Sequence, residues 1–370
     1  MRNLKQIKNP KGKKILVRVD FNVPMDGRKV RDDFRIRKAI PTIKYLKKLG
    51  AKIILITHLG KGGETLAPVA EALAKYTKVK FVENILGIDA EVAINEMKNG
   101  DVILLENLRN DKGEQSCDRF FASSLAKLGE AYVNEAFSVS HRQDASIVLL
   151  PKLLPSYAGF QLEDEIKHLS LVFKKPKHPF LFILGGAKFD TKLPILNKYI
   201  RFADKIFIGG ALLNDFLRAE GEAIGDSLSS GENLGIQKLI GHPKIILPDD
   251  VLVKTKDGVI NKSIHDVGLH EFILDVGNHS VRNLLPLIQK AKLILWNGPL
   301  GDYEIGGDVA TKKVLKAVAK SKAVSVIGGG DTAELVSALK MEKKFSFVST
   351  GGGATLDFLA NKNLPGIKAL

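Results

Sequence analysis

The chain has 370 residues, a single cysteine and a formal net charge of +15. No apolar run reaches the roughly 18–20 residues of a membrane span, and the first residues lack the apolar stretch of a signal peptide. One cysteine excludes an intrachain disulfide and fits a reducing compartment, so we expect a cytoplasmic protein that does not bind membranes. The length predicts two domains.

The positive charge alone would allow nucleic acid, anionic membrane or small polyanionic substrates as partners. The lysines occur in scattered pairs, such as 47–48 and 343–344, and not in a stripe with interleaved aromatic residues. This distribution favours a solvated surface. A basic nucleic-acid-binding protein stays as the alternative, and it predicts tight, salt-sensitive binding.

In the first half, apolar runs alternate with amphipathic stretches. We expect strands at 14–19, 52–57, 79–82, 101–105, 131–133 and 146–150, with helices between them, for example at 35–49 and 67–76. Continuously apolar strands that alternate with helices predict a parallel sheet covered on both faces.

Polar and cationic residues follow several of these strands, where parallel α/β sheets bind their ligands. Arginine and lysine at such ends can hold carboxylate or phosphate oxygens. Each residue alone is more often half of a surface ion pair, but the bias towards cations favours an anion site. The residues are Asp20, Asn22, His58, Lys61, Arg109, His141 and Arg142, with Arg35 and Arg37 just downstream of the first strand.

Two breaks, at 153–160 and 174–179, flank an amphipathic stretch at 161–173. We expect a helix here that connects two α/β halves. The alternative is an ordinary surface helix of one larger domain.

In the second half, a glycine turn follows nearly every apolar run. We expect strands at 180–184, 205–208, 244–248, 292–296, 323–327 and 345–348, and a hairpin at 251–260 with Asp257-Gly258 as its turn. The pattern predicts a second parallel α/β sheet.

The last glycine turn, Gly351-Gly352-Gly353, precedes a predicted helix at 354–360. Glycines leave backbone N–H groups uncovered, and the first turn of a helix has unpaired donors and the positive pole of the dipole. The turn is therefore suited to hold a phosphate, although a tight turn that binds nothing is the plain alternative.

Several residues near these turns allow a structural and a functional interpretation. Asp331 could cap a helix, bind magnesium beside phosphates, or do both. Lys188 and Lys192 could neutralise phosphate oxygens or simply begin a solvated helix, and Glu304 could bind a ribose or be an exposed acid.

The common nucleotide fingerprints are weak or absent. Residues 328–333 match G-x-G-x-x-A, but no acidic residue ends the next strand, so a nicotinamide-dependent enzyme is a minor alternative. The sequence contains no G-x-x-x-x-G-K-[ST] loop.

Eight ordered segments of the chain form a recognisable set. They are Arg18-Val-Asp-Phe-Asn-Val-Pro24, His58-Leu-Gly60, Leu104-Leu-Glu-Asn-Leu-Arg109, His141-Arg142, Gly185-Gly-Ala-Lys188 with Lys192, Trp296-Asn-Gly-Pro299, Gly328-Gly-Gly-Asp-Thr332 and Ser349-Thr-Gly-Gly-Gly-Ala354. With them the chain resembles the phosphoglycerate kinase family over essentially its full length.

The resemblance implies two doubly wound, Rossmann-like parallel-sheet domains joined by a helix, with the C-terminal tail returning to the first domain. It implies a 3-phosphoglycerate-binding domain at 1–155, a connecting helix and hinge at 156–178, a nucleotide-binding domain at 179–350 and the tail segment at 351–370. We expect a monomer whose closing motion brings two half-sites together.

The implied reaction is the reversible, Mg²⁺-dependent transfer of a phosphoryl group from 1,3-bisphosphoglycerate to ADP, which gives 3-phosphoglycerate and ATP. Carried over residue by residue, the triose site is Asp20, Asn22, Arg35, His58, Lys61, Arg109 and Arg142. The nucleotide site is Lys192, Gly209, Gly210, Asn297, Glu304, Gly329, Gly330, Asp331 and Thr332, with Asp331 as the metal ligand. The migrating phosphoryl group would be held by Arg35, Lys188 and the amides of Gly351, Gly352 and Gly353.

The chain departs from the usual family sequence in the triose site. The usual His-Leu-Gly-Arg-Pro is His58-Leu-Gly-Lys-Gly62 here, so Lys61 keeps the charge but loses the planar fork of arginine. Asp144 stands where a second histidine is usual, which is expected to raise the KM for the triose substrate. No indispensable residue is missing, so we expect an active enzyme.

Overall fold

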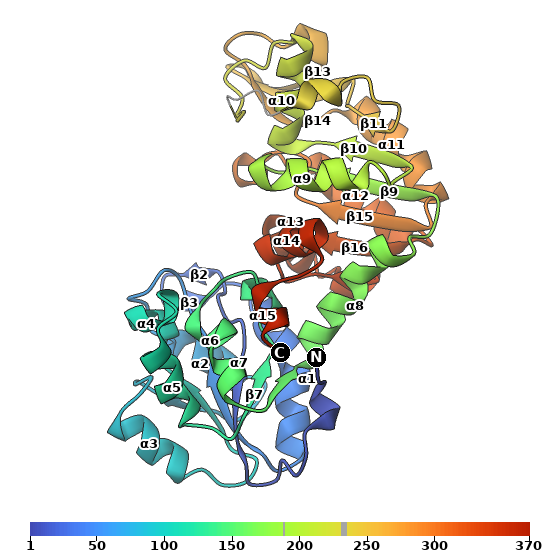
Figure 1. The fold of residues 1–370 in the computed structure, drawn as a ribbon. Coiled ribbons are helices and arrows are strands. Elements are labelled where there is room, and N and C mark those ends of the chain that lie inside the picture. Colours follow the sequence, from blue (N-terminus) through green and yellow to red (C-terminus); the bar gives the residue numbers. More distant parts are fainter. Residues whose placement is uncertain (188, 231–234) are drawn as a thin grey trace. The chain divides into compact units, whose positions relative to one another are not determined.

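The computed structural model describes residues 1–187, 189–230 and 235–370. The chain forms two compact units (Figure 1). The first unit contains residues 1–167 and 361–370, and the second contains residues 168–360. In the described part of the chain, no helix is long and apolar enough to cross a membrane.

The first unit is built on a six-stranded parallel sheet in the order β5-β6-β4-β1-β7-β8. Its strands are β1 (Lys14–Arg18), β4 (Lys52–Ile56), β5 (Lys80–Val82), β6 (Val102–Leu105), β7 (Ala131–Asn134) and β8 (Ser156–Ala158). Alternate residues of β1 enter different cores: Ile15 and Val17 belong to one buried cluster, and Leu16 belongs to another. The sheet is therefore covered on both faces, as predicted.

Helices form the two layers that cover this sheet. Residues of α1 (Phe34–Lys48) and α2 (Ala67–Ala74) complete one cluster, and residues of α3 (Ile88–Asn95) and α5 (Arg119–Ala126) complete the other. The remaining elements are the hairpin β2 (Met25–Asp26) and β3 (Lys29–Val30), and α4 (Lys112–Gln115), α6 (Ala145–Val148), α7 (Leu150–Leu153) and α15 (Pro365–Lys368).

Residues 361–370 at the C-terminus belong to the first unit, whereas residues 351–360 belong to the second. The backbone N–H of Gly366 donates to the carbonyl of Ser140 at 2.8 Å. A Cβ at Gly366 would lie only 2.7 Å from the side chain of Ile147, so a glycine is needed where the tail meets α6.

The predicted strand at 146–150 is wrong, because this run forms α6 and the start of α7. The sixth strand is β8, inside the segment predicted as a break. A short buried apolar run has the same pattern in a helix and in a strand. A contact with a residue far away in sequence favours the helix here. The carboxylate of Glu114 accepts the N–H of Ser146 at 2.9 Å in the first turn of α6.

The second unit is built on another six-stranded parallel sheet, in the order β11-β10-β9-β15-β16-β17. Its strands are β9 (Phe180–Leu184), β10 (Lys205–Ile208), β11 (Ile245–Ile246), β15 (Leu293–Asn297), β16 (Val324–Gly328) and β17 (Phe347–Val348). The predicted hairpin is also present, as β12 (Asp250–Thr255) and β13 (Gly258–Ser263), and β14 (Phe272–Val276) extends it.

The chain segments between and after these strands also form helices. They are α9 (Phe189–Tyr199), α10 (Gly210–Glu220), α11 (Asn278–Lys290), α12 (Val309–Lys320), α13 (Gly330–Ala338) and α14 (Gly353–Asn361). The predicted connecting helix is α8 (Phe160–Lys174), whose residues run from the first unit into the second. Short 3-10 turns are η1 (Leu4–Gln6), η2 (Leu108–Asn110), η3 (Phe137–Val139), η4 (Ile236–Lys238), η5 (Ile264–Asp266), η6 (Tyr303–Ile305) and η7 (Glu342–Lys344).

A buried carboxylate fixes the start of α8. Glu135, directly after β7, is 3% exposed, and both its oxygens accept the N–H of Gln161 at 3.2 Å. Burial raises the pKa of Glu135 to about 8, although hydrogen bonds from Thr42 and from the start of α8 oppose the shift. A Cβ at Gly159 would lie 1.7 Å from Glu135 Oε2, so the carboxylate fits only because residue 159 is glycine.

We predict that Gly159→Ala lowers the free energy of unfolding by about 2 kcal/mol or more, because the new methyl group must displace the buried carboxyl group of Glu135. Urea unfolding at neutral pH measures the change. Gly330→Ala is the control, since nothing lies within 4 Å of a Cβ there. Equal stability of the two variants would contradict the prediction.

Candidate active site

Loops that follow four neighbouring strands of the first sheet carry the predicted triose site. Asp20 follows β1, His58 follows β4, Arg109 follows β6 in the turn η2, and Arg142 follows β7. These strands lie side by side in the order β6-β4-β1-β7 and are parallel, so their carboxyl ends share one edge of the sheet. The structure thus brings the predicted residues to a common edge.

Asp20 holds Arg35 at this edge. Its Oδ2 accepts hydrogen bonds from Arg35 Nη1 at 2.5 Å and from Ser138 Oγ, and its Oδ1 accepts the N–H of Asn22 at 3.1 Å. Burial acts to raise the pKa of Asp20, but Arg35, His58 and these hydrogen bonds outweigh burial, so the pKa lies below its usual value. Asp20 is therefore an anion at neutral pH that orients a cationic side chain.

The loop after β4 is held by Asn22 and Arg109. The N–H of Gly60 donates to Asn22 Oδ1 at 2.9 Å, and the carbonyl of Gly60 accepts from Arg109 Nη1. Arg109 is only 9% exposed, and its Nε and Nη2 have no partner among the described residues. Two unpaired donors of one guanidinium can bind an oxyanion in a bidentate way.

The two remaining predicted cations of this edge, Lys61 and Arg142, are exposed. Within the described residues, neither side chain makes a hydrogen bond or an ion pair. The residue after Lys61 is Gly62, whose φ of +119° is outside the range of proline. With Lys-Gly in place of the usual Arg-Pro, this loop therefore has a backbone conformation that a proline at position 62 could not adopt.

Asp144 is a buried carboxylate close to the cations. It is 6% exposed, and its Oδ2 has no hydrogen-bond partner among the described residues. Burial lowers the pKa of Arg109 and the charge of Arg142 adds to this, whereas the negative charge of Asp144 opposes it. Asp144 thus offsets part of the positive charge at this edge, in the direction expected to weaken the binding of an anion.

In the second unit, the glycine turns pack backbone against backbone. A Cβ at Gly185 would lie 2.0 Å from the carbonyl oxygen of Pro299, and a Cβ at Gly298 would lie 2.2 Å from that of Gly185. At Gly210 a Cβ would lie 2.2 Å from the nitrogen of Gly186. Only glycines permit this approach, and they leave an edge made of peptide groups.

Lys192 brings a positive charge to this edge. The residue is 4% exposed, and a Cβ at Gly186 or at Gly298 would lie 2.6 Å from its Nζ. The ammonium group therefore sits against the turns that follow β9 and β15. Lys188, which the sequence places in the first of these turns, lies outside the described residues.

Two buried side chains of the second unit have a polar atom without a partner. Asn297 Nδ2 and Thr332 Oγ1 make no hydrogen bond with any described residue, and the residues are 2% and 0% exposed. Nδ2 lies 3.1 Å from a Cβ built at Gly328, and Oγ1 lies 3.5 Å from one built at Gly329. Both atoms thus lie at the turn that opens α13, where anionic oxygens are favoured.

A cavity of about 200 Å³ opens beside these turns. Its lining combines apolar Leu213, Leu274 and Leu300 with polar Asn214, Glu304 and Asp331. Among the predicted nucleotide residues, Gly210, Glu304 and Asp331 line this cavity. Gly209 does not line it, and its N–H pairs with the carbonyl of Leu184 at 2.9 Å.

Asp331 does not cap α13 as the simplest sequence interpretation expected. The N-cap residue is Gly329, and Asp331 is the second residue of the helix, with an exposed side chain. A carboxylate that is not engaged in capping can coordinate a cation.

The turn Gly351-Gly352-Gly353 is partly satisfied by the protein. The N–H of Gly351 donates to Ser349 Oγ at 3.1 Å. The amides of Gly352 and Gly353 have no acceptor among the described residues, and nothing lies within 4 Å of a Cβ at Gly352. Two of the three predicted amides are therefore open to an anion.

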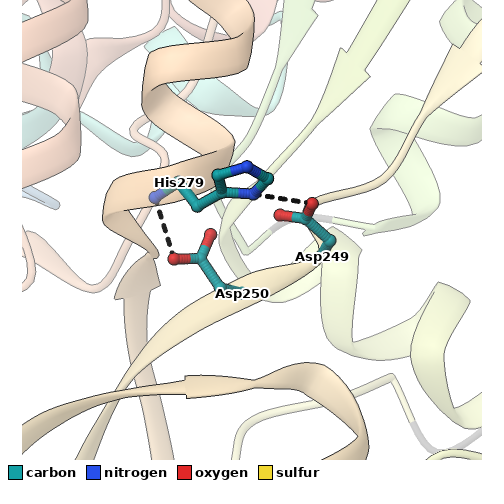
Figure 2. A group of neighbouring side chains, drawn as sticks. All are labelled: Asp249, Asp250 and His279. Carbon is teal, nitrogen blue, oxygen red and sulfur yellow. Dashed lines mark hydrogen bonds and ion pairs between the residues drawn. The ribbon is translucent and has the colours of Figure 1, made fainter.

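One group of metal-capable side chains lies elsewhere in the second unit (Figure 2). Asp249, Asp250 and His279 each place a ligand atom within 4.8 Å of the others. His279 Nδ1 pairs with Asp249 at 2.8 Å, and Asp250 accepts the N–H groups of His279 and Ser280 at 2.9 and 2.8 Å. The two bonds to Asp250 cap the start of α11, whereas Asp249 pairs with the side chains of His279 and Ser280. Sequence analysis had given these residues no role.

Sequence analysis also missed three residues that the structure adds. Ser138 supports Asp20, Asn214 lines the cavity, and Arg18 contacts His58 at 3.2 Å. Arg18 and Ser138 are each close to the carboxyl end of a strand that carries predicted residues, and this position is the signal that could have indicated them.

The phosphoglycerate kinase profile matches residues 4–362 of this sequence. The chain belongs to the phosphoglycerate kinase family. The phosphoglycerate kinase of Coprothermobacter proteolyticus is 40% identical over 378 residues, which cover 97% of this chain and 96% of the relative. That of Aquifex aeolicus is 41% identical over 375 residues, which cover 96% of this chain and 94% of the relative.

Solved structures of the family share the fold. The phosphoglycerate kinase of Coxiella burnetii superposes with a TM-score of 0.82 at 33% identity and covers 99% of this chain and 97% of its own. That of Pyrococcus horikoshii OT3 gives a TM-score of 0.88 at 31% identity, with 100% and 98% covered. The family, the two-domain α/β fold and the activity as a phosphotransferase with a carboxyl acceptor are thereby confirmed, and the nucleic-acid alternative finds no support.

We predict that Asp20→Asn lowers the free energy of unfolding by about 2 kcal/mol at pH 7, because Arg35 loses a charged partner. The low pKa of Asp20 stabilises the fold above the unfolded-state pKa near 3.8, and this contribution is lost as the pH falls through the folded-state pKa. The difference in the free energy of unfolding between variant and parent should therefore become smaller in acid.

Urea unfolding at pH 7 and at about pH 3 tests this, with exposed Asp26→Asn as the control. A gap that stays constant or widens towards acid would show that Asp20 is not held as an anion in the folded state.

Proposed function

We propose that the carboxyl edge of the first sheet binds 3-phosphoglycerate and 1,3-bisphosphoglycerate, and that the glycine turns of the second unit bind ADP and ATP with Mg²⁺. One observation carries this proposal. At each edge, deeply buried side chains keep donors that no described residue accepts: Nε and Nη2 of Arg109, and Nδ2 of Asn297 and Oγ1 of Thr332. Such groups cost free energy unless a ligand pairs them.

At the triose edge, each predicted residue has a distinct task in this proposal. Arg109 binds phosphate oxygens with its two unpaired donors, and the exposed Lys61 and Arg142 add positive charge. Asp20 orients Arg35, and Asn22 holds the Gly60 loop. His58 contributes a ring nitrogen to the same edge.

At the nucleotide edge, the cavity receives the base and Glu304 the ribose. The phosphates lie on the amides of Gly329 and Gly330 at the start of α13, next to Lys192 and the open groups of Asn297 and Thr332.

The residues at this edge fit a magnesium ion. Mg²⁺ takes one or two carboxylates together with phosphate oxygens and water, and Asp331 offers one exposed carboxylate in the lining of the cavity. When bound, Mg²⁺ neutralises phosphate charge and polarises the transferred group.

The transfer itself needs alignment and charge neutralisation, and no covalent intermediate on the protein. Arg35, the open amides of Gly352 and Gly353, and Lys188 outside the described residues supply donors for the three equatorial oxygens of the migrating group. Direct transfer requires both substrates on the enzyme at once, so sequential kinetics accompany this mechanism.

We predict that the purified chain makes ATP from ADP and 1,3-bisphosphoglycerate. Arg35→Ala and Lys188→Ala should each cost about 2.7–4 kcal/mol of barrier, a loss of about 10²–10³ in kcat, and their combination should abolish turnover. A coupled assay of ATP formation measures this. Arg37→Ala, two residues away and paired with Asp33, is the matched control and should keep its kcat. A chain without turnover would defeat the proposed reaction.

We predict that Thr332→Val raises the KM for ADP about tenfold, because it removes a buried donor to phosphate oxygens, and leaves the KM for 1,3-bisphosphoglycerate unchanged. Steady-state kinetics with each substrate varied in turn separate the two constants. A change confined to the triose constant would mean that this edge has been assigned to the wrong substrate.

A further inference from the structure

A polar network lies buried at the end of β1, beneath the candidate triose site. Arg18, Glu114 and Ser146 are each 0% exposed. Ser146 donates its N–H and its Oγ–H to Glu114 at 2.9 and 2.6 Å, and it accepts from Arg18 Nε at 2.8 Å. Arg18 Nη2 lies 3.7 Å from Glu114 Oε1, and Nη1 donates to the carbonyl of Val19 at 2.6 Å. The guanidinium group is thus fixed in position and orientation.

The fixed guanidinium also meets His58, which is 1% exposed. Arg18 Nη2 lies 3.2 Å from His58 Nδ1. A guanidinium carries only donors and stays charged, so Nδ1 must be the acceptor in this contact. An imidazole that accepts at Nδ1 is neutral and carries its proton on Nε2.

The charges around His58 agree with a neutral ring. Burial first, then Arg18, Arg109 and Arg142, lower the pKa of His58 well below its usual value, whereas Asp20 acts in the opposite direction. Nε2 has no hydrogen-bond partner among the described residues, yet it is not enclosed by them. Its N–H is therefore open to solvent or to a ligand.

We propose that Glu114 and Arg18 are positioning residues that hold His58 as the neutral Nε2–H tautomer. His58 then offers the triose phosphate one hydrogen-bond donor whose state does not change between about pH 5.5 and 8. The inference rests on the proposed assignment of this edge to the triose substrate. An ordinary histidine would change its charge in this range, and the affinity for an anion would change with it.

The bond from the N–H of Ser146 to Glu114 at the start of α6 explains the buried carboxylate, but it does not require a buried guanidinium group beside it. Replacing a buried ion pair by apolar side chains of similar size is often neutral or stabilising. Fixing the neighbouring imidazole is a task that apolar side chains could not perform.

Long-range ¹H–¹⁵N spectra of the full chain with ¹⁵N-labelled histidine test the tautomer directly, with the His58 signals assigned from His58→Gln. We expect an acceptor-type Nδ1 and a donor-type Nε2 that do not titrate between about pH 5.5 and 8. A proton on Nδ1, or titration of His58 within that range, would overturn the proposal.

The double variant Arg18→Met with Glu114→Gln tests the positioning role. It removes both buried charges together, because removal of one would leave the other unpaired. We expect His58 to titrate in this variant. Relative to the parent, its KM for 3-phosphoglycerate should fall about five- to tenfold from pH 8 to 5.5, since a protonated ring attracts the anion. The ratio to the parent cancels the titration of the substrate phosphate itself.

Lys262→Met with Glu271→Gln, which removes an ion pair of the second unit, is the matched control and should leave the His58 signals unchanged. If His58 kept its tautomer in the Arg18 and Glu114 variant, the positioning role would be refuted. A second outcome concerns the substrate. If the tautomer were as expected, but 3-phosphoglycerate did not shift the His58 signals and His58→Gln had the KM of the parent, the assignment of His58 to the substrate would be refuted instead.

Discussion

In both sheets every strand runs in the same direction, so all carboxyl ends of a sheet gather at one edge. Loops far apart in sequence, such as those of Asp20 and Arg109, are thereby brought together by the pairing of their strands. Helices cover both faces of such a sheet, which leaves its edge as the place where polar groups can meet a ligand. The location of both candidate sites depends on this constraint.

The proposed function assigns anion binding to both edges, and the two edges offer different groups for it. The first uses long cationic side chains whose geometry is set by carboxylates and carbonyls, as Asp20 sets Arg35. The second uses peptide groups brought so close that only glycines fit, with Lys192 beside them. At both edges, buried donors have no acceptor within the described part of the chain, at a cost of about 1–3 kcal/mol each, which a bound ligand would offset.

The fold could be predicted from the sequence because, along most of the chain, the apolar runs of the strands end at recognisable glycine turns. The strands at 180–184 and 205–208 were predicted to the residue, since a glycine turn ends each of them. The strand at 146–150 was wrong because Glu114, distant in sequence, decides the structure there. The site residues were chosen from strand ends and from family resemblance. Their pairing could not be predicted, because Asp20 with Ser138 and Arg18 with His58 are contacts between separate loops.

The backbone of Gly62 limits how this chain could regain the usual family sequence. At a φ of +119° a proline cannot be accommodated, and a Cβ would lie 2.7 Å from the carbonyl oxygen of Arg109. An arginine at position 61 would be compatible with the present loop, whereas a proline at 62 would require the loop to refold first. The two positions are therefore coupled, and their order of substitution matters: an evolutionary path that changed residue 62 before the loop had moved would pass through a destabilised intermediate.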